Sequence, residues 1–180
     1  TKLLRHYIDV GRVEEKAASG GKGLSESPEE LAAFRERYRI PKFEPYTFAE
    51  GEVVEAFVGL DGGSTSTKAV LLDKDRNVLV KSYQLSKGNP IIDTQEVLGN
   101  LEQYVQDQGA TLKVLGIGTT GYAKDILKDV LAADVALVET VAHTESALQF
   151  YDDVDVLVDV GGQDIKLIIP HQVNQRIIDS

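Results

Sequence analysis

The pattern of hydrophobic and polar positions changes near residue 50. Beyond it, residues 53–60, 68–73 and 78–84 form three apolar runs rich in Val and Leu, each with the length and composition of a β-strand. The second and third runs are joined by DKDRN, and short turn-rich links of this kind join antiparallel strands. We therefore expect the main domain to begin with three strands connected as hairpins.

Helical and strand patterns alternate after the third run. In residues 94–108, Val97, Leu98, Leu101 and Val105 recur at a spacing that places them on one face of a helix. The segments that follow predict a strand at 112–118, a helix at 122–131, a strand at 135–139 and a helix at 141–150. The order βββαβαβα predicts an α/β fold class, with a mixed sheet and helices on its faces.

The residues before this pattern contain two predicted helices and a linker. One helix should begin at Ser27, because Ser is a good N-cap, a proline follows at the first helical position and Glu30 lies three residues after the cap. It should end near Tyr38, before the segment RIPKFEPYTFAEGE, whose two prolines are typical of an extended linker. We expect a helical connector over 1–50 and a first domain over 51–153.

Composition and charge exclude several kinds of partner. The 180 residues carry a net charge of −10, whereas nucleic acids and anionic membranes require a basic surface. No apolar stretch approaches the ~18 residues of a membrane span, and no signal-peptide pattern is present. We therefore expect a cytoplasmic protein. Cys is absent, so these residues provide no disulfide or thiolate. Met is absent even at position 1, which favours an internal part of a longer chain.

One glycine-containing motif occurs twice. VGLDGGSTSTKAVLL at 58–72 and VLVDVGGQDIKLII at 156–169 both contain an apolar strand, an aspartate, two adjacent glycines, a lysine and a second apolar strand. Within a one-residue shift, the matched positions are Asp61 with Asp159, Gly62-Gly63 with Gly161-Gly162, and Lys68 with Lys166. A repeat suggests a duplicated structural unit. A second domain should therefore occupy 154–180, with its third strand at 175–180.

Adjacent glycines beside hydroxyl side chains suit the binding of phosphate. Without a Cβ, backbone N–H groups can approach an anion closely, and Ser64, Thr65 and Ser66 add further donors. A carboxylate at the end of each preceding strand suits Mg²⁺. The P-loop and Rossmann patterns are absent, and a simple tight turn is the alternative for either hairpin alone. The pair predicts a clamp for a polyphosphate and its metal, with both glycine loops at the same edge of the sheet.

The segments GLDGGSTSTKAVLLD, GIGTTGYAKDIL and DVGGQDIK resemble the BadF/BadG/BcrA/BcrD-type ATPases of the acetate and sugar kinase/Hsp70/actin superfamily. The pair Gln163-Asp164 is the most specific part, and the resemblance covers about residues 56–170. It implies an actin-like, ribonuclease H-like fold. It also implies ATP hydrolysis that drives electron transfer into a 2-hydroxyacyl-CoA dehydratase or a benzoyl-CoA reductase partner.

The same resemblance implies a homodimer that shares one [4Fe–4S] cluster, with cysteines that follow the second phosphate motif. This sequence has no Cys, so the cluster ligands would lie outside it, as would the adenine-binding motif. We therefore expect these 180 residues alone to bind ATP weakly or not at all, and to be inactive.

The resemblance also assigns roles to individual residues. Asp61 and Asp159 would organise Mg²⁺, and Gln163 would orient the attacking water; these three form the expected catalytic set. The phosphates would be bound by the two loops, at Gly62, Gly63, Ser64, Thr65, Ser66, Lys68, Gly161 and Gly162. For Lys68, an exposed position on a strand is an equal alternative.

Two further features leave alternatives open. The segment GTTG at 118–121 fits either an anion site at a helix start or a tight turn with a Thr N-cap. His143 could be a base, although a lone His on a helix is more often structural. The surrounding ETVAHTESA lacks the Asp that sugar kinases place there. An activating ATPase is therefore the first hypothesis. The alternatives are a sugar or N-acetylhexosamine kinase and a regulatory module that binds nucleotide without turnover.

Overall fold

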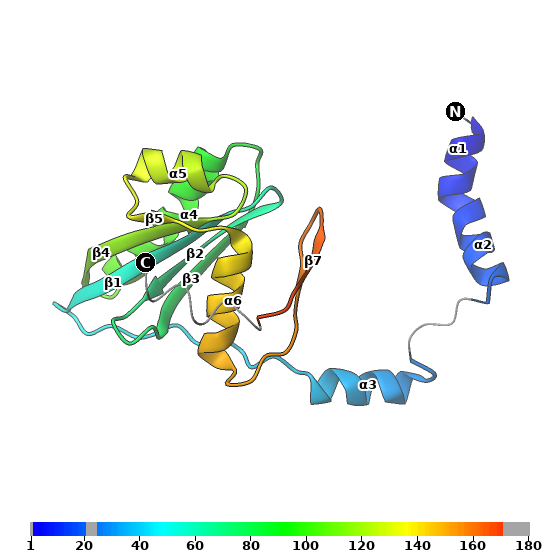
Figure 1. Ribbon diagram of the computed structural model, residues 1–180, viewed down its shortest axis with the longest axis horizontal. Helices are drawn as coiled ribbons and strands as arrows, with labels where there is room; N and C mark the ends of the chain where they lie inside the picture. Colours follow the sequence, from blue (N-terminus) through cyan, green and yellow to red (C-terminus); the bar gives the residue numbers. More distant parts are fainter. Residues whose placement is uncertain (1, 21–24, 171–180) are drawn as a thin grey trace. The chain divides into compact units, whose positions relative to one another are not determined.

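The computed structural model describes residues 2–20 and 25–170, and Figure 1 shows their arrangement along the chain. The chain separates into two compact units, with the division between Phe43 and Glu44. In the described residues, no helix combines the length and the apolarity that crossing a membrane requires. The predicted third strand of the second domain, at 175–180, lies outside these residues.

The first unit consists of helices with no buried side chains. They are α1 (Lys2–His6), the π-helical segment η1 (Tyr7–Gly11), α2 (Arg12–Ala18) and α3 (Pro28–Arg37). The predicted start of α3 is confirmed, because the Ser27 hydroxyl accepts a hydrogen bond from the Glu30 N–H at 3.1 Å. Tyr38 ends that helix, as the proline-containing segment after it predicts.

The second unit is built on a five-stranded mixed sheet with the order β3-β2-β1-β4-β5. Its strands are β1 (Val53–Gly62), β2 (Ser66–Leu72), β3 (Val78–Leu85), β4 (Thr111–Thr120) and β5 (Val135–Ala136). The first three pair as antiparallel hairpins, and β4 runs parallel to both β1 and β5. The predicted α/β class with a mixed sheet is therefore confirmed (Figure 1).

One face of the sheet forms the core together with α4 (Pro90–Gln106). This helix begins at Asn89, whose side-chain oxygen accepts from the Ile91 and Ile92 N–H groups, with a proline at the first helical position. Alternate residues of β1 and β2 point toward it, as the period of two in a strand requires. The fully buried side chains between them include Leu71, Val97, Leu101 and Val105.

Two shorter helices complete the layers of the unit. The helix α5 (Lys124–Leu131) packs beside α4, against β4 and β5. The helix α6 (Glu139–Phe150) lies over the opposite face, where a cavity of about 600 Å³ separates it from the sheet at Gly59 and Val70. Helices therefore cover both faces of the sheet. The carboxyl-terminal ends of the parallel strands β1 and β4 lie at the same edge of the sheet, between these helices.

The chain then forms a separate antiparallel hairpin of β6 (Leu157–Val160) and β7 (Ile165–Ile168). One face of this hairpin is apolar and exposed, at Val156, Val158, Val160, Ile165, Leu167 and Ile169. The other face carries Asp159 and Lys166, which lie opposite each other in the register. This second face turns toward the start of α6.

Candidate functional site

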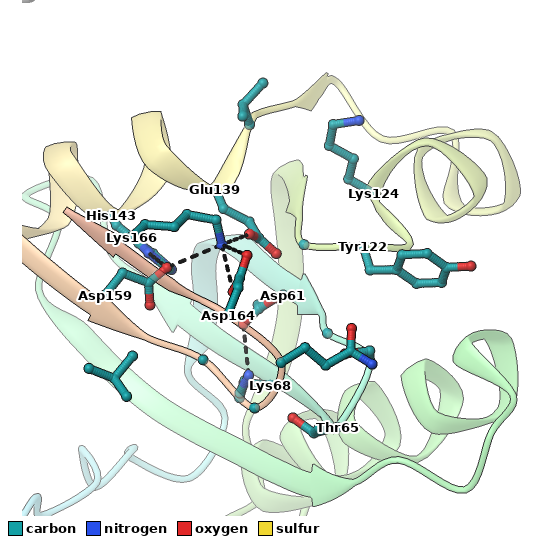
Figure 2. Close-up of a pocket in the computed structure, with 18 residues that line it drawn as sticks. Asp61, Thr65, Lys68, Tyr122, Lys124, Glu139, His143, Asp159, Asp164 and Lys166 are labelled. Carbon is teal, nitrogen blue, oxygen red and sulfur yellow. Dashed lines mark hydrogen bonds and ion pairs between the residues drawn. The ribbon is translucent and has the colours of Figure 1, made fainter. Parts of the chain in front are cut away.

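The two glycine loops meet at one cavity of about 780 Å³. Its walls come from the β1–β2 loop, the segment before α5, the start of α6 and the β6–β7 hairpin (Figure 2). At the contact, a Cβ placed on Gly162 would overlap the Thr65 methyl group and lie 2.7 Å from the Thr65 hydroxyl. The expectation that both loops lie at the same edge is therefore confirmed.

The structure brings most of the predicted site residues into this lining. They are Asp61, Gly63, Ser64, Thr65, Lys68, Asp159, Gly161, Gly162 and Gln163. Gly62 and Ser66 lie beneath it instead. A Cβ on Gly62 would be 2.5 Å from a methyl carbon of Leu127 in α5, and Ser66 is 5% exposed. These two positions shape the turn from below and do not line the cavity.

An equivalent backbone hydrogen bond closes each of the two loops. The Gly63 N–H donates to the Ser66 carbonyl at 3.1 Å, and the Gly161 N–H donates to the Asp164 carbonyl at 2.9 Å. A Cβ on Gly63 would lie 2.8 Å from that Ser66 oxygen, so a side chain would disturb the turn. The shared hydrogen bond supports the repeat found in the sequence, with one correction. Gly63 is equivalent to Gly161 and not to Gly162, because each lies two residues after the aspartate that faces the lysine.

Asp61 is held between two elements at the edge of the sheet. Lys68 lies opposite it in the β1–β2 register, and its ammonium donates to the Asp61 carboxylate at 2.9 Å. On the other side, a Cβ at Gly121 would overlap the second carboxylate oxygen and lie 2.8 Å from the Gly62 carbonyl. Gly121 also has φ +87°, which favours glycine. The Lys68 side chain is therefore an ion-pair partner at the cavity, 41% exposed.

The two threonines before Gly121 belong to β4 and do not cap the next helix. The Thr119 hydroxyl donates to the Lys124 carbonyl at 2.9 Å, and the Thr120 hydroxyl donates to the Leu137 carbonyl at 2.9 Å. Of the two alternatives left open for this segment, the Thr N-cap is wrong, because α5 begins at Lys124 with Ala123 at the cap position. Of this segment, only Gly121 and the residues just after it line the cavity.

Asp159 lies across the cavity in a larger group of charges. Its carboxylate is 3.2 Å from His143 Nδ1 and 3.5 Å from the Lys166 ammonium. That ammonium is closer to Glu139, at 2.8 Å, and to Asp164, at 3.0 Å (Figure 2). The hydrogen bonds that the Lys166 ammonium donates to Glu139 first, and then to Asp164, raise the pKa of Lys166 above its ordinary value, so it stays charged.

Charges of both signs line the cavity in nearly equal number. The carboxylates are Asp61, Glu139, Asp159 and Asp164, and the ammonium groups are Lys68, Lys124 and Lys166. Because the carboxylates exceed the ammonium groups by one, this lining does not neutralise a polyphosphate. A polyphosphate bound here would need an accompanying cation.

The carboxylates of the cavity suit a cation that is also bound by phosphate oxygens. Within residues 2–20 and 25–170, no group of three or more His, Asp or Glu side chains is arranged to hold a metal ion. Mg²⁺ does not require one, because it keeps several waters and binds through one or two carboxylates together with phosphate oxygens. Asp61 and Asp159, one from each hairpin, both line the cavity and supply such carboxylates.

Sequence reasoning did not assign a role to Glu139 or Lys166, and it noted Gly121 only as part of the GTTG segment. For Lys166 the signal was present in the repeat, since it matches Lys68. For Glu139, and for the contact between Gly121 and Asp61, no local signal exists, because the partners are distant in the sequence. These contacts follow from how the hairpins and helices pack.

Comparison with known proteins gives consistent matches. Residues 58–177 match the model of the BadF/BadG/BcrA/BcrD ATPase family. The (R)-2-hydroxyglutaryl-CoA dehydratase activating ATPase of Acidaminococcus fermentans is 30% identical over 114 residues, which cover 62% of this chain and 41% of that protein. The chain therefore spans about two fifths of the length of this relative.

Two solved structures share the fold. The activator of the 2-hydroxyisocaproyl-CoA dehydratase from Clostridium difficile, with bound ADPNP, has a TM-score of 0.55 and 24% identity, over 63% of this chain and 40% of that one. Component A of the (R)-2-hydroxyglutaryl-CoA dehydratase from Acidaminococcus fermentans has a TM-score of 0.51 and 27% identity, over 64% and 43%. The expected actin-like ATPase fold is confirmed.

Proposed function

This chain belongs to the BadF/BadG/BcrA/BcrD ATPase family, and from that premise we propose that the cavity between its two glycine hairpins binds ATP and contributes to its hydrolysis. The observation that carries the proposal is the meeting of the repeated motifs. Each hairpin supplies an aspartate and a glycine turn to one cavity, and Gly162 lies against Thr65 where the loops touch.

The phosphate groups of ATP lie along the two turns in this proposal. The backbone at Gly63, Gly161 and Gly162 offers an approach that no Cβ obstructs. Ser64 and Thr65 are exposed residues in the cavity lining, and their hydroxyls add donors. Gly62 and Ser66 contribute indirectly. Gly62 lets the first turn pack against Leu127 of α5, and the Ser66 carbonyl accepts the hydrogen bond that closes this turn.

Asp61 and Asp159 would hold Mg²⁺ together with the phosphates. When bound, the ion supplies positive charge where negative charge develops on the transferred phosphoryl group. Lys68 holds the Asp61 carboxylate at the cavity edge and keeps its own charge close to the phosphates. Gln163 lies in the second turn, exposed within the lining, where its amide can orient a water molecule.

We also propose that the β6–β7 hairpin begins a second domain of the same kind, as the repeat suggests, after a first domain at 51–153 and a connector at 1–50. The shared turn hydrogen bond and the shared Asp–Lys register support this. The apolar face of the hairpin, exposed at Val158 and Leu167, corresponds to Leu60 and Ala69, which α4 covers in the first domain.

The matched relatives are named as activators of 2-hydroxyacyl-CoA dehydratases, and we propose the same class of partner for this protein. ATP turnover would then activate electron transfer in a dehydratase or reductase that acts on a CoA thioester. A homodimer with a shared [4Fe–4S] cluster is part of this proposal. Its cysteine ligands would come from residues outside this sequence, which has none.

A sugar kinase is less well supported by the sequence of α6. A kinase needs a base that is open to the sugar hydroxyl, and the segment ETVAHTESA lacks the Asp that sugar kinases place there. The Nδ1 atom of His143 lies 3.2 Å from the Asp159 carboxylate, which leaves Nε2 open. The missing Asp, and not the orientation of His143, is therefore what counts against a kinase.

The proposal is tested by Asp159→Ala in the full-length protein that contains these residues. Hydrolysis of Mg-ATP should fall by about 100-fold or more, because a charge that supports the metal is lost. Asp155→Ala is the matched control, since Asp155 is exposed and outside the cavity lining. Both variants should keep the circular dichroism of the parent. Unchanged turnover in Asp159→Ala would contradict the assigned role, and ATP binding without turnover in the parent would favour the regulatory alternative.

A further inference from the structure

Each hairpin carries an aspartate opposite a lysine, but the two pairs differ in the distance between the ammonium and the carboxylate. Lys68 lies opposite Asp61 in the first hairpin, and Lys166 lies opposite Asp159 in the second. In the first pair, the ammonium is 2.9 Å from the carboxylate. In the second, the same separation is 3.5 Å, which is too long for a normal hydrogen bond. The register is equal, so another element must draw Lys166 away.

That element is α6, which begins at Glu139. The Glu139 carboxylate accepts from the Lys166 ammonium at 2.8 Å, and Asp164 adds a second contact at 3.0 Å (Figure 2). A carboxylate in the first turn of a helix is stabilised by the backbone N–H groups there. The Glu139 and Lys166 side chains are 33% and 29% exposed, so solvent screens their attraction only in part.

The position of Lys166 affects what Asp159 can bind. An ammonium group that donates directly to a carboxylate competes with a metal ion for the same oxygen atoms. Asp61 is in that situation with Lys68, while Asp159 has its lysine at 3.5 Å and His143 at 3.2 Å. Asp159 is also the less exposed of the two carboxylates, at 16% against 27%. It therefore has the environment better suited to a cation that enters with ATP.

We propose that Glu139 is a positioning residue that holds Lys166 away from Asp159, and so leaves the Asp159 carboxylate available to the cation that accompanies ATP. This inference rests on the proposed function. It assigns to the start of α6 a part in cation binding, through a lysine on the neighbouring hairpin and not through contact with the ion.

A double-mutant cycle on the full-length protein tests this inference. Mn²⁺ binding in the presence of a non-hydrolysable ATP analogue is measured by electron paramagnetic resonance. Glu139→Gln should weaken Mn²⁺ binding about fivefold, the scale of one partly exposed ion pair, because Lys166 then turns to Asp159. In a Lys166→Met background, the same Glu139→Gln change should have no effect. Glu145→Gln removes the same charge from the same helix, outside this cavity, and should leave binding unchanged.

Two outcomes would overturn the inference, and they are distinguishable from failure of the proposed function. If Glu139→Gln weakens Mn²⁺ binding equally with and without Lys166, the carboxylate acts by its charge alone. If Glu139→Gln leaves Mn²⁺ binding unchanged in the wild-type background, the contact between Glu139 and Lys166 does not affect cation binding. If the wild-type protein binds neither the analogue nor Mn²⁺ with it, the ATP site itself is refuted.

Discussion

Gly162 of the second glycine turn lies directly against Thr65 of the first. The approach is so close that a Cβ on Gly162 would overlap the Thr65 methyl group and lie 2.7 Å from its hydroxyl. The contact joins the two halves of the repeated motif and defines how near the two aspartate-bearing hairpins come. The geometry of the proposed phosphate clamp therefore depends on the absence of one side chain.

Gly162→Ala should separate the two turns and lower the turnover of ATP in the full-length protein about tenfold or more, because small displacements of reacting groups have large effects on rate. The hydrolysis rate at saturating Mg-ATP measures this. Thr65→Ala removes the overlapping methyl and hydroxyl and leaves only a Cβ contact at 3.1 Å, so the double variant should recover most of the loss relative to Thr65→Ala alone. A double variant as impaired as Gly162→Ala would show that the contact with Thr65 is not the cause.

Gly62→Ala should destabilise the second unit by about 1–3 kcal/mol through overpacking. A Cβ there would lie 2.5 Å from Leu127 and 3.1 Å from Ala123, and both of those side chains are buried. Urea unfolding followed by circular dichroism measures the change. Gly99, in the exposed face of α4, is the matched control because nothing lies within 4 Å of its added Cβ. Gly99→Ala should stabilise the protein by about 0.5–1 kcal/mol, and equal effects at both positions would contradict the packing argument.

Glu55 should make the stability of the sheet depend on pH. Its carboxylate accepts from Lys113 at 2.7 Å and from Lys74 at 2.5 Å, and these hydrogen bonds lower the pKa of Glu55 from 4.5 to about 2. Because the pKa in the folded state is below its ordinary value, the stabilisation is complete above pH 4.5 and is lost as the pH falls toward 2.

Urea unfolding of the wild type and Glu55→Gln tests this between pH 6 and the acid limit of folding. The two proteins should differ most above pH 4.5, and the difference should shrink steadily below it. Lys113→Met removes the largest cause of the lowered pKa and should reduce the difference. A gap between wild type and Glu55→Gln that does not change with pH would refute the ion-pair explanation.

The sequence by itself determined the features that local forces control. The apolar periods predicted the hairpins, a strand at the position of β4 and the buried face of α4, because strand and helix repeats follow from backbone geometry. Ser27 predicted the start of α3, since an N-cap bonds within its own first turn. The repeat predicted two matching turns, and Gly63 and Gly161 indeed make the same hydrogen bond.

Other features were decided only by tertiary contacts. Phe48 lies in a segment whose prolines indicate an extended linker, yet it is 5% exposed and its ring packs near that of Tyr104. Gly62 and Ser66 belong to the phosphate-loop pattern, but packing against α5 places Gly62 below the cavity. Strand propensity alone could not show that Gly62 lies outside the cavity lining. The position of Gly62 relative to the cavity depends on which side of the sheet α5 occupies.

The charged network of the site is the clearest case. The sequence shows Asp61, Lys68, Asp159 and Lys166 in matching positions of the repeat. The structure makes the pairs unequal, because Glu139 at the start of α6 lies 2.8 Å from Lys166, and Gly121 lies against Asp61. Coulomb attraction and steric overlap act over a few ångströms in space, whatever the separation along the chain. The identity of the charged groups was therefore readable from the sequence, and their partners were set by the packing of α6 and β4 around the two hairpins.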